Sequence, residues 1–423
     1  MSEISAGRPF GYEKDRLTVA GVDVAALADE FGTPLYVYAG DQIAERAQML
    51  QEAFAAQEHT VCYAVKANSS LAILKLLGGL GCGFDIVSGG ELERVKRAAP
   101  DAVGKVVFSG VGKQAWEMDA ALKAGIMLFN VESEAELEVL AARAQALRIT
   151  AKIALRVNPD VFAETHPYIS TGLSEHKFGI AIAKAREVYA RAAKMQGIEP
   201  AGVSVHIGSQ IRSVEPFAES VKRVRALVEE LRGDGMDIRF LDAGGGFGVE
   251  YGNADFDPAA RVAEYAAALL KVLDGAKVHL LLEPGRFLVA QAGALVTRVL
   301  YTKVNGKKKF VITDAGMNDL IRPSLYQAHH EIVPVVVSSR ETEVADIVGP
   351  VCESGDFFAH DRSMAEVRAG ELVALLDAGA YGMSLASHYN SRVKPAEVLV
   401  SGGVVRLVRR RETLEDLMAG EIL

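Results

Sequence analysis

Residues 61–87 read VCYAVKANSSLAILKLLGGLGCGFDIV, a short apolar run, an Ala/Leu-rich stretch and a second short apolar run. An apolar run of this length is typical of a buried strand, and the stretch between the two runs has the composition and spacing of a helix. Parallel strands need a crossover connection, which is usually a helix. The segment therefore predicts one β-α-β unit of a parallel sheet.

The same alternation extends from about residue 35 to residue 285 and contains eight apolar runs. They are VCYAV (61–65), GFDIV (83–87), VVFSG (106–110), IMLFN (126–130), KIALRV (152–157), VSVHI (203–207), FLDAG (240–244) and HLLLE (279–283). Eight strands that alternate with helices favour a closed (β/α)8 TIM barrel. The alternative is a doubly wound open sheet, for which we find no topological switch point.

The pattern changes after residue 285. Alternating or β-branched runs separated by turn residues follow, for example KKFVITDAG (308–316) and EVLVSGGVVRLVRRR (397–411). These runs predict a mostly antiparallel β-domain. The first 34 residues contain a similar run, and we expect them to pack with that domain. The predicted organisation is a barrel over 35–285 and a β-domain formed by 1–34 and 286–423.

The composition is that of a soluble globular protein, with 50% hydrophobic residues, 24% charged residues and a net charge of −9. The net charge disfavours nucleic-acid binding, and the KKK at 307–309 follows Asn-Gly, which indicates a hairpin turn. No segment has the length of a membrane span or the apolar core of a signal peptide. Three cysteines do not form a disulfide framework, so we expect a cytoplasmic protein. No spacing of His, Cys, Asp or Glu predicts a metal site.

Polar residues stand at the ends of most predicted strands. They are Lys66 at the first, Asp85 and Ser88 at the second, Asn130 at the fourth, Arg156 and Asn158 at the fifth, His206 and Ser209 at the sixth, Gly244–Gly248 at the seventh, and Glu283 and Arg286 at the eighth. In an α/β barrel these ends meet on one face, where active sites are built. The pattern therefore predicts a site rather than scattered surface residues.

Lys66 ends an apolar run that is expected to be buried. An unpaired ammonium is costly in such a place and tends to lose its proton, and a neutral amine condenses with carbonyl compounds. The alternative is a lysine whose stem packs in the core while its head reaches water.

Three other features have a chemical use at the same face. The turn DAGGGFG (242–248) can bring amide groups close to a phosphate, or can serve only as a tight connection. Glu283 can hold a protonated ring nitrogen, or can form an ion pair with Arg286. His206 can stack on an aromatic ligand or act as an acid or base, or can be structural. Together with Lys66, these groups match the requirements of pyridoxal phosphate (PLP).

A series of motifs in this order resembles the fold-type III PLP-dependent decarboxylases, which share the alanine racemase-like barrel. The motifs are YAVKAN, FDIVSGGEL, HKFG, HIGSQ, GGGFG, EPGR, RPSLY, CESGD and AYG, and the resemblance extends from about residue 8 to about residue 420. For the cofactor, the resemblance implies that Lys66 binds PLP covalently, that His206 stacks on the ring and that Glu283 pairs with the ring nitrogen. It implies that Asp85 supports the hydrogen bonds beside the ring and that Tyr381 lies beside the cofactor and substrate. The phosphate would be bound by Ser209 together with Gly244, Gly245 and Gly246.

The resemblance also implies how the substrate is held. Arg286, Arg322 and Tyr326 would bind a distal carboxylate, Glu353 would bind a distal amino group, and Cys352 would donate the proton that replaces the lost carboxylate. It implies a homodimer in which the 352–356 loop completes the site of the partner subunit, although this loop could also be only a polar turn. The segment 176–179 resembles a flap, and we assign no role to His176, His329 or His330.

Charge distinguishes the candidate substrates. Ornithine and lysine present a distal cation, whereas meso-diaminopimelate presents a distal zwitterion that needs both an acid and an arginine. Glu353 with Arg286 and Arg322 matches the second case. The resemblance therefore implies decarboxylation of meso-2,6-diaminopimelate to L-lysine and CO2, the last step of lysine biosynthesis. The alternatives are a decarboxylase of the ornithine, lysine or carboxynorspermidine type, a racemase of the alanine type, and a catalytically dead regulator.

Overall fold

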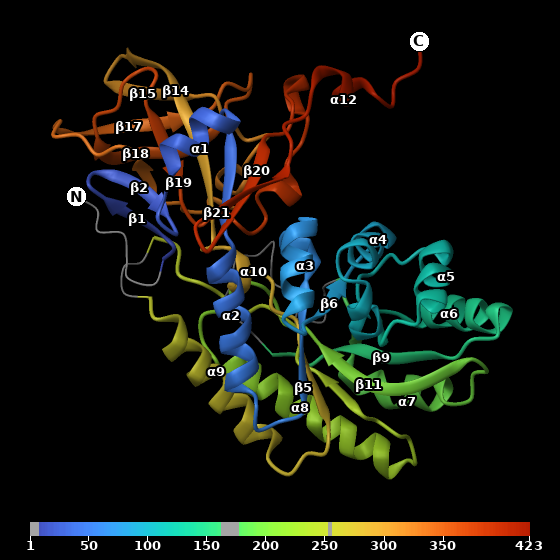
Figure 1. Cartoon of the computed structure of the whole chain (residues 1–423). Helices are drawn as coiled ribbons and strands as arrows, with labels where there is room; N and C mark the ends of the chain where they lie inside the picture. Colours follow the sequence, from blue (N-terminus) through green and yellow to red (C-terminus); the bar gives the residue numbers. More distant parts are fainter. Residues whose placement is uncertain (1–7, 162–176, 253–255) are drawn as a thin grey trace. The chain divides into compact units, whose positions relative to one another are not determined.

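Eight parallel strands close into a barrel in the computed structural model, which describes residues 8–161, 177–252 and 256–423 (Figure 1). The order around the barrel is β5-β6-β7-β8-β9-β11-β12-β13, and β13 pairs with β5 to close it. The strands are β5 His59–Ala64, β6 Gly83–Ile86, β7 Val106–Phe108, β8 Leu128–Val131, β9 Ala151–Asn158, β11 Ile198–Val205, β12 Phe240–Asp242 and β13 His279–Leu282. The predicted barrel is confirmed.

Helices follow the strands and lie outside them (Figure 1). They are α2 Gly40–Ala53, α3 Leu71–Gly79, α4 Gly89–Ala98, α5 Ala115–Ala124, α6 Glu134–Leu147, α7 Ile182–Ala192, α8 Glu215–Gly233, α9 Pro258–Leu273 and α10 Arg286–Val289, with 3-10 turns η1 Val65–Ala67 and η2 Pro100–Lys105 and a short strand β10 Ile180–Ala181 beside β9. Inside the barrel, Cys62, Val107, Leu128, Ala154, Ala201 and Leu281 form a buried cluster with one side chain from each of six strands. Burial of these small and branched side chains fills the barrel and holds its strands together.

The strand β11 differs most from its prediction. The apolar run begins at Val203, whereas the strand begins at Ile198 and includes Pro200, with a register shift against β9 between Pro200 and Gly202. Proline cannot donate to a ladder and glycine weakens a strand, so the local sequence reads as a turn. Pairing with β9 overrides that preference.

A second unit contains residues 8–43, 249–252, residue 256 and 288–423 among the described residues. Its larger sheet has the order β18-β17-β15-β14-β4-β20-β21, and β19 pairs with β14 and β16. The elements are β1 Phe10–Glu13, β2 Arg16–Val19, β3 Val22–Asp23, α1 Val24–Phe31, β4 Leu35–Ala39, β14 Gly293–Asn305, β15 Lys308–Thr313, α11 Arg322–Tyr326, β16 Ile332–Pro334, β17 Thr342–Val348, β18 Phe357–Ala365, β19 Leu372–Leu375, β20 Ala396–Ser401, β21 Val404–Arg409, α12 Leu414–Met418 and the 3-10 turns η4 Met383–Leu385 and η5 Tyr389–Ser391.

Most pairings of this unit are antiparallel, as predicted, and the expected Asn-Gly turn joins β14 to β15. The N-terminal segment also packs here as expected, because Leu17 and Val24 share a buried cluster with Val296 and Val398. Residue 17 also donates a backbone hydrogen bond to the carbonyl of Val335.

The structure corrects the expected boundary at residue 35. The strand β4 pairs with β14 and β20 and so belongs to the second unit, which also takes residues 249–252 and 256. All five residues of β4 are buried, so its composition is the same as that of a buried barrel strand. Only the pairing partners distinguish the two cases.

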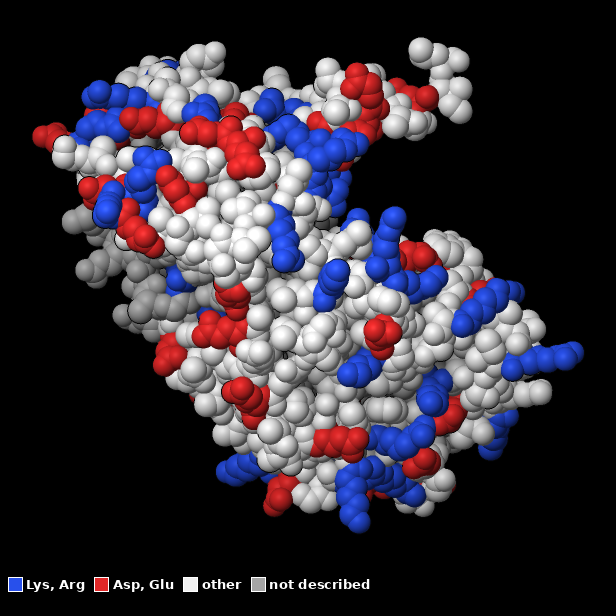
Figure 2. Space-filling model, in the orientation of Figure 1, with Lys and Arg blue, Asp and Glu red and all other residues white. Residues whose placement is uncertain are grey.

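Charged residues of both signs are interspersed over the face shown in Figure 2. Within the described ranges, no helix combines the length and the apolar character that are needed to cross a bilayer.

Candidate active site

Lys66 lies at the carboxyl end of β5, in the short turn η1 that follows the strand. Its Nζ lies 2.5 Å from Oδ2 of Asp85, because β5 and β6 pair in parallel with Ala64 opposite Asp85. The Lys66 side chain is 36% exposed and Asp85 is fully buried. Lys66 is therefore not the unpaired buried lysine that the sequence suggested; its charge is compensated by a neighbouring strand. The other carboxylate oxygen, Asp85 Oδ1, is buried and accepts no hydrogen bond from the described residues.

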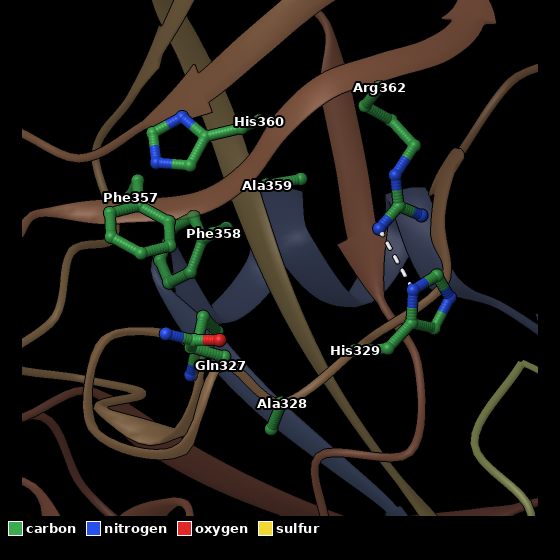
Figure 3. Close-up of a pocket in the computed structure, with 9 residues that line it drawn as sticks. Gln327, Ala328, His329, Phe357, Phe358, Ala359, His360 and Arg362 are labelled. Atoms are coloured by element: carbon green, nitrogen blue, oxygen red, sulfur yellow. Dashed lines mark hydrogen bonds between the residues drawn. The ribbon is translucent and has the colours of Figure 1, made fainter.

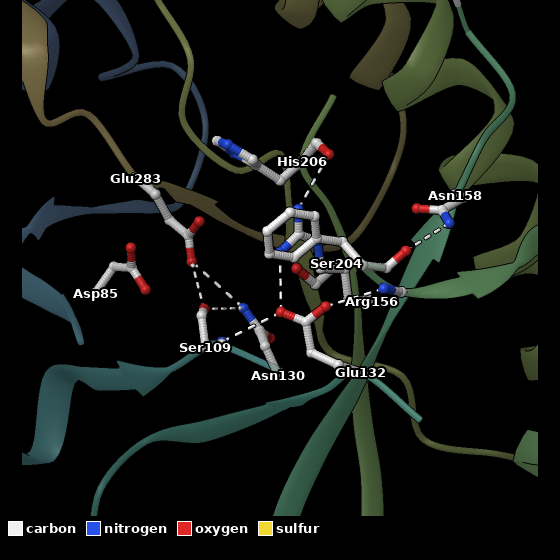
Figure 4. Close-up of polar contacts among 12 residues, drawn as sticks. Asp85, Ser109, Asn130, Glu132, Arg156, Asn158, Ser204, His206 and Glu283 are labelled. Carbon is white, nitrogen blue, oxygen red and sulfur yellow. Dashed lines mark hydrogen bonds and ion pairs between the residues drawn. The ribbon is translucent and has the colours of Figure 1, made fainter. Parts of the chain in front are cut away.

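Glu283 follows β13 and is buried in a polar cluster (Figure 4). Its Oε1 accepts from Ser109 Oγ at 3.4 Å and from Asn130 Nδ2 at 3.3 Å. Asn130 Nδ2 also donates to Asp242 Oδ2 at 2.7 Å, so one amide links two buried carboxyl groups. Burial, reinforced by the charges of Asp242 and Asp85, raises the pKa of Glu283 well above its usual value, and burial also raises the pKa of Asp242. Glu283 therefore holds a proton more strongly than an exposed glutamate does.

The contacts of Glu283 decide between its two sequence-based interpretations. The expected alternative was an ion pair with Arg286, but the side chains that contact Glu283 among the described residues are those of Ser109, Asn130 and Asp242. Arg286 instead donates from Nη2 to Ser209 Oγ at 3.1 Å. Glu283 is thus directed into the barrel rather than neutralised by the arginine of its own motif.

His206 follows β11, and its Nδ1 accepts a hydrogen bond from the amide of Gly245 at 3.0 Å. An Nδ1 that accepts carries no proton, so the imidazole is neutral, with its hydrogen on Nε2. Arg156 Nη2 lies 3.4 Å from the His206 carbonyl oxygen, and Figure 4 shows this contact. Burial, together with the charges of Arg156 and Lys66, lowers the pKa of His206 well below its usual value. The site therefore holds an uncharged imidazole.

The glycine turn after β12 is packed against the neighbouring strand ends. A Cβ on Gly244, Gly245 or Gly246 would lie 2.2 Å from a carbonyl oxygen of Val205, Glu283 or Gly208, and Gly244 and Gly246 have φ values of +70° and +103°. Close packing alone therefore requires glycine here.

The backbone amide groups of this turn differ in whether they donate a hydrogen bond within the protein. The amides of Gly244 and Gly245 bond to Asp242 Oδ1 and His206 Nδ1, whereas those of Gly246 and Phe247 donate to none of the described residues. An anion can be held by amides of this kind.

The second unit carries the other predicted residues. Arg322 begins α11, and Tyr326 ends it and is half-buried. Arg322 is buried, and its Nη1 lies 2.8 Å from His330 Nε2. His330, to which no role was assigned from its sequence position, is completely buried beside it.

The CESGD loop is held by its last residue. Asp356 accepts from the amides of Met317 and Val351, both at 2.6 Å, and is buried. This leaves Cys352 exposed on the turn and Glu353 beside Tyr389, whose hydroxyl donates to Glu353 Oε2 at 3.3 Å. The loop is therefore a fixed turn that presents a thiol and a carboxylate.

Tyr381 has a left-handed backbone with φ of 56°. Bulky residues rarely adopt this conformation, and tightly packed glycines lie near it on both sides in the sequence. A Cβ on Gly379 would lie 1.9 Å from the Val289 carbonyl oxygen, and one on Gly382 would lie 2.6 Å from the Tyr36 hydroxyl. Strain of this kind concentrates at functional sites.

Comparison with known proteins shows the family of this chain. A family model described as "Pyridoxal-dependent decarboxylase, pyridoxal binding domain" matches residues 40–290. The diaminopimelate decarboxylase of Pseudomonas aeruginosa is 50% identical over 414 residues, which are 98% of this chain and 99% of the relative.

The chain belongs to the diaminopimelate decarboxylase family.

Solved structures agree with this assignment. A crystal structure of diaminopimelate decarboxylase from Helicobacter pylori complexed with L-lysine is similar with a TM-score of 0.89 and 44% identity, and the match covers 94% of this chain and 98% of that chain. The structure from M. jannaschii in co-complex with L-lysine has a TM-score of 0.92 and 39% identity, over 99% of this chain and 98% of that chain.

Several polar residues of this diaminopimelate decarboxylase family member were not assigned a role from sequence. Ser109 was overlooked, Asp242 was interpreted only as part of the glycine turn, and Asn130 and Arg156 were noted only as strand-end residues. The carboxylate of Glu132 accepts one hydrogen bond from Arg156 Nη1 and one from the amide of Gly179, each at 2.9 Å (Figure 4). The only available signal was their position at strand ends. Of the expected flap, His176 lies outside the described residues.

A pocket of the second unit does not contain the predicted site. It is lined by Pro323, Gln327, Ala328, His329, Phe357, Phe358, Ala359, His360 and Arg362 (Figure 3). None of these residues is among those that the family resemblance implies for cofactor or substrate.

Proposed function

We propose that this chain decarboxylates meso-2,6-diaminopimelate to L-lysine and CO2 with PLP as cofactor, the last step of lysine biosynthesis through diaminopimelate. The observation that carries the proposal is the convergence of three groups at one end of the barrel. These are the Lys66–Asp85 pair, the buried Glu283 and the neutral His206. We place the reaction in the cytoplasm, a compartment that suits three free cysteines.

The residues fit the proposed cofactor. PLP, when bound, supplies an aldehyde that condenses with amines and a ring that accepts the electrons left when CO2 departs. Lys66 would hold the aldehyde carbon, and Glu283 would keep a proton at the ring nitrogen. Neutral His206 would stack on the ring without adding charge. The amides at Gly246 and Phe247, with Ser209, would bind the phosphate, supported by the packing of Gly244 and Gly245.

Substrate recognition would follow from charge. Arg286, Arg322 and Tyr326 would bind the distal carboxylate, and Glu353 would bind the distal ammonium group. Tyr381 would lie beside both cofactor and substrate. An arginine and an acid together select a zwitterion over the simple cation of ornithine or lysine.

The proton that replaces the lost carboxylate would come from Cys352, which is exposed on its turn. We propose that the chain forms a homodimer in which the partner subunit's Cys352 and Glu353 complete each barrel site. The support for this proposal is the fixed turn that exposes both side chains, together with the family resemblance.

Carbon dioxide release tests the reaction. The purified protein with PLP is expected to release CO2 from meso-diaminopimelate and to form L-lysine, with little release from ornithine, lysine or arginine. Release from ornithine or lysine instead would overturn the specificity and favour the alternative decarboxylase. No release from any of the four would overturn the proposed activity.

Mixed dimers test the shared site. Lys66→Ala and Cys352→Ala subunits are each expected to be inactive as homodimers. When equal amounts are unfolded together and refolded, about half of the dimers are mixed and each has one intact site, so about one quarter of wild-type turnover is expected. No recovery above the sum of the separate variants would contradict a site built from two subunits. Wild-type protein taken through the same procedure controls for refolding losses.

A further inference from the structure

Arg322 is held between an aromatic ring and an imidazole. Its guanidinium carbon lies 4.4 Å from the centre of the Tyr251 ring, and its Nη1 lies 2.8 Å from His330 Nε2. The rings of Tyr251 and His330 meet edge to face at 5.7 Å. All three side chains belong to the second unit, and both Arg322 and His330 are buried. The position of the guanidinium group is therefore fixed from two directions.

The other nitrogen of His330 fixes its tautomer. His330 Nδ1 lies 2.8 Å from the carbonyl oxygen of Leu376, which can only accept a hydrogen bond. Nδ1 therefore carries the hydrogen, and Nε2 is left with the lone pair that accepts from Arg322. The pairing of β16 with β19 holds the carbonyl in place, because the Leu376 amide donates to the Glu331 carbonyl oxygen at 2.8 Å.

The imidazole is uncharged in this arrangement. Burial, then the charge of Arg322, lowers the pKa of His330 well below its usual value, and His329 and Arg362 act in the same direction. A neutral acceptor orients the guanidinium group but does not cancel its charge, whereas a carboxylate would do both.

Asp377 is a buried acid of the second unit, and it forms an ion pair with Arg8. Asp377 Oδ2 accepts from Arg8 Nη2 at 2.7 Å and from the Gly252 amide at 3.3 Å. Arg8 is therefore the ion-pair partner of Asp377, whereas His330 is an uncharged partner of Arg322.

We propose that His330 is a positioning residue that sets the preference for a substrate with a distal carboxylate. It acts through Arg322, by aiming a charged guanidinium group without neutralising it. This inference rests on the proposed function, in which Arg322 binds that carboxylate.

Two amide variants separate the nitrogens of His330. The side-chain amide introduced by His330→Gln can reach the place of Nε2 and accept from Arg322, whereas the shorter one introduced by His330→Asn reaches only the place of Nδ1 and leaves Arg322 without this partner. Both variants lose the ring, so each controls for the other.

The probes are L-lysine and 1,5-diaminopentane, which differ by one carboxylate. Binding of both to the PLP-loaded protein is measured by calorimetry. We expect His330→Asn to weaken L-lysine binding about tenfold or more, the scale of one hydrogen bond to a charged group, and to leave 1,5-diaminopentane unchanged. His330→Gln is expected to retain most of the L-lysine affinity.

The outcomes distinguish the inference from the proposed function. A wild-type protein that does not prefer L-lysine to 1,5-diaminopentane contradicts the proposed function. The role of His330 is overturned if the wild type prefers L-lysine but the His330→Asn variant binds both ligands as the wild type does. It is also overturned if the variant loses affinity for both ligands equally.

A second measurement needs no variant. The ¹⁵N NMR signals of His330 in the wild-type protein are expected to show Nδ1 protonated and Nε2 unprotonated at neutral pH. An imidazolium, or a proton on Nε2, would overturn the inference even if His330→Asn failed to fold.

Discussion

Replacement of Lys66 by alanine is expected to remove the visible absorption of enzyme-bound PLP and to lower turnover of meso-diaminopimelate by about a thousandfold or more. The ε-amine is the group that would bind the cofactor covalently, and the alanine methyl group offers no nucleophile. Absorption spectra of the protein with added PLP and CO2 release from the same samples measure the two effects.

Two matched variants separate the possible causes. Lys66→Arg keeps a cation that can pair with Asp85 but cannot form the covalent bond, so it is expected to lose the absorption as Lys66→Ala does. Lys75 lies exposed on α3, and Lys75→Ala is expected to behave as the wild type. Lys66→Ala protein with normal absorption and turnover would refute the assignment of the cofactor lysine.

The Glu283→Gln variant should bind PLP through Lys66 but lose about 10²- to 10³-fold in kcat, as when one preorganised electrostatic contact is removed. A neutral amide cannot hold a proton at the ring nitrogen as a carboxylate does, so the ring would withdraw electrons less well. Stopped-flow measurement of CO2 release at saturating substrate gives kcat. Ser109→Ala removes one hydrogen bond to Glu283 without changing its charge, and a much smaller loss is expected.

The same variant should change how stability depends on pH. Burial raises the folded-state pKa of Glu283 above the unfolded value of about 4.3, so the folded chain binds more protons than the unfolded chain above that pH. Stability then falls as pH rises. Without cofactor, the wild type should lose stability relative to Glu283→Gln as the pH rises above the unfolded-state pKa of about 4.3, measured as urea unfolding midpoints. Parallel curves for the two proteins would show that Glu283 is not the titrating group.

The fold followed from the sequence wherever a local pattern decides it. Each of the eight apolar runs became a strand of the barrel, because a buried parallel strand needs only a short apolar run with turns on either side. The strand β4 has the same pattern, but its partners β14 and β20 lie far along the chain, so it was placed with the wrong unit. The sequence pattern of a segment indicates whether the strand is buried, but it does not indicate with which strands it pairs.

The candidate site shows the same limit. Lys66, Asp85, His206 and Glu283 could be anticipated because they stand at strand ends, where barrel geometry brings side chains together. Asp242 stands beside a glycine turn and was interpreted as part of it. His330 was assigned no role, because its burial and its two hydrogen bonds depend on the pairing of β16 with β19 and on its contact with Arg322. Residues that act through another side chain have no sequence signature of their own.

The placement of β4 between β14 and β20 has a consequence for synthesis of the chain on the ribosome. The last barrel strand is complete at Leu282, but β20 begins only at Ala396. At about 5–20 residues per second, the buried residues Leu35–Ala39 wait on the order of tens of seconds for both neighbours. Because β14 is made just after the last barrel strand and β20 much later, this apolar strand has only one of its two neighbours while the barrel can already fold. Yield in the cell should therefore depend on the rate of translation and on the supply of chaperones more than on the stability of the finished protein.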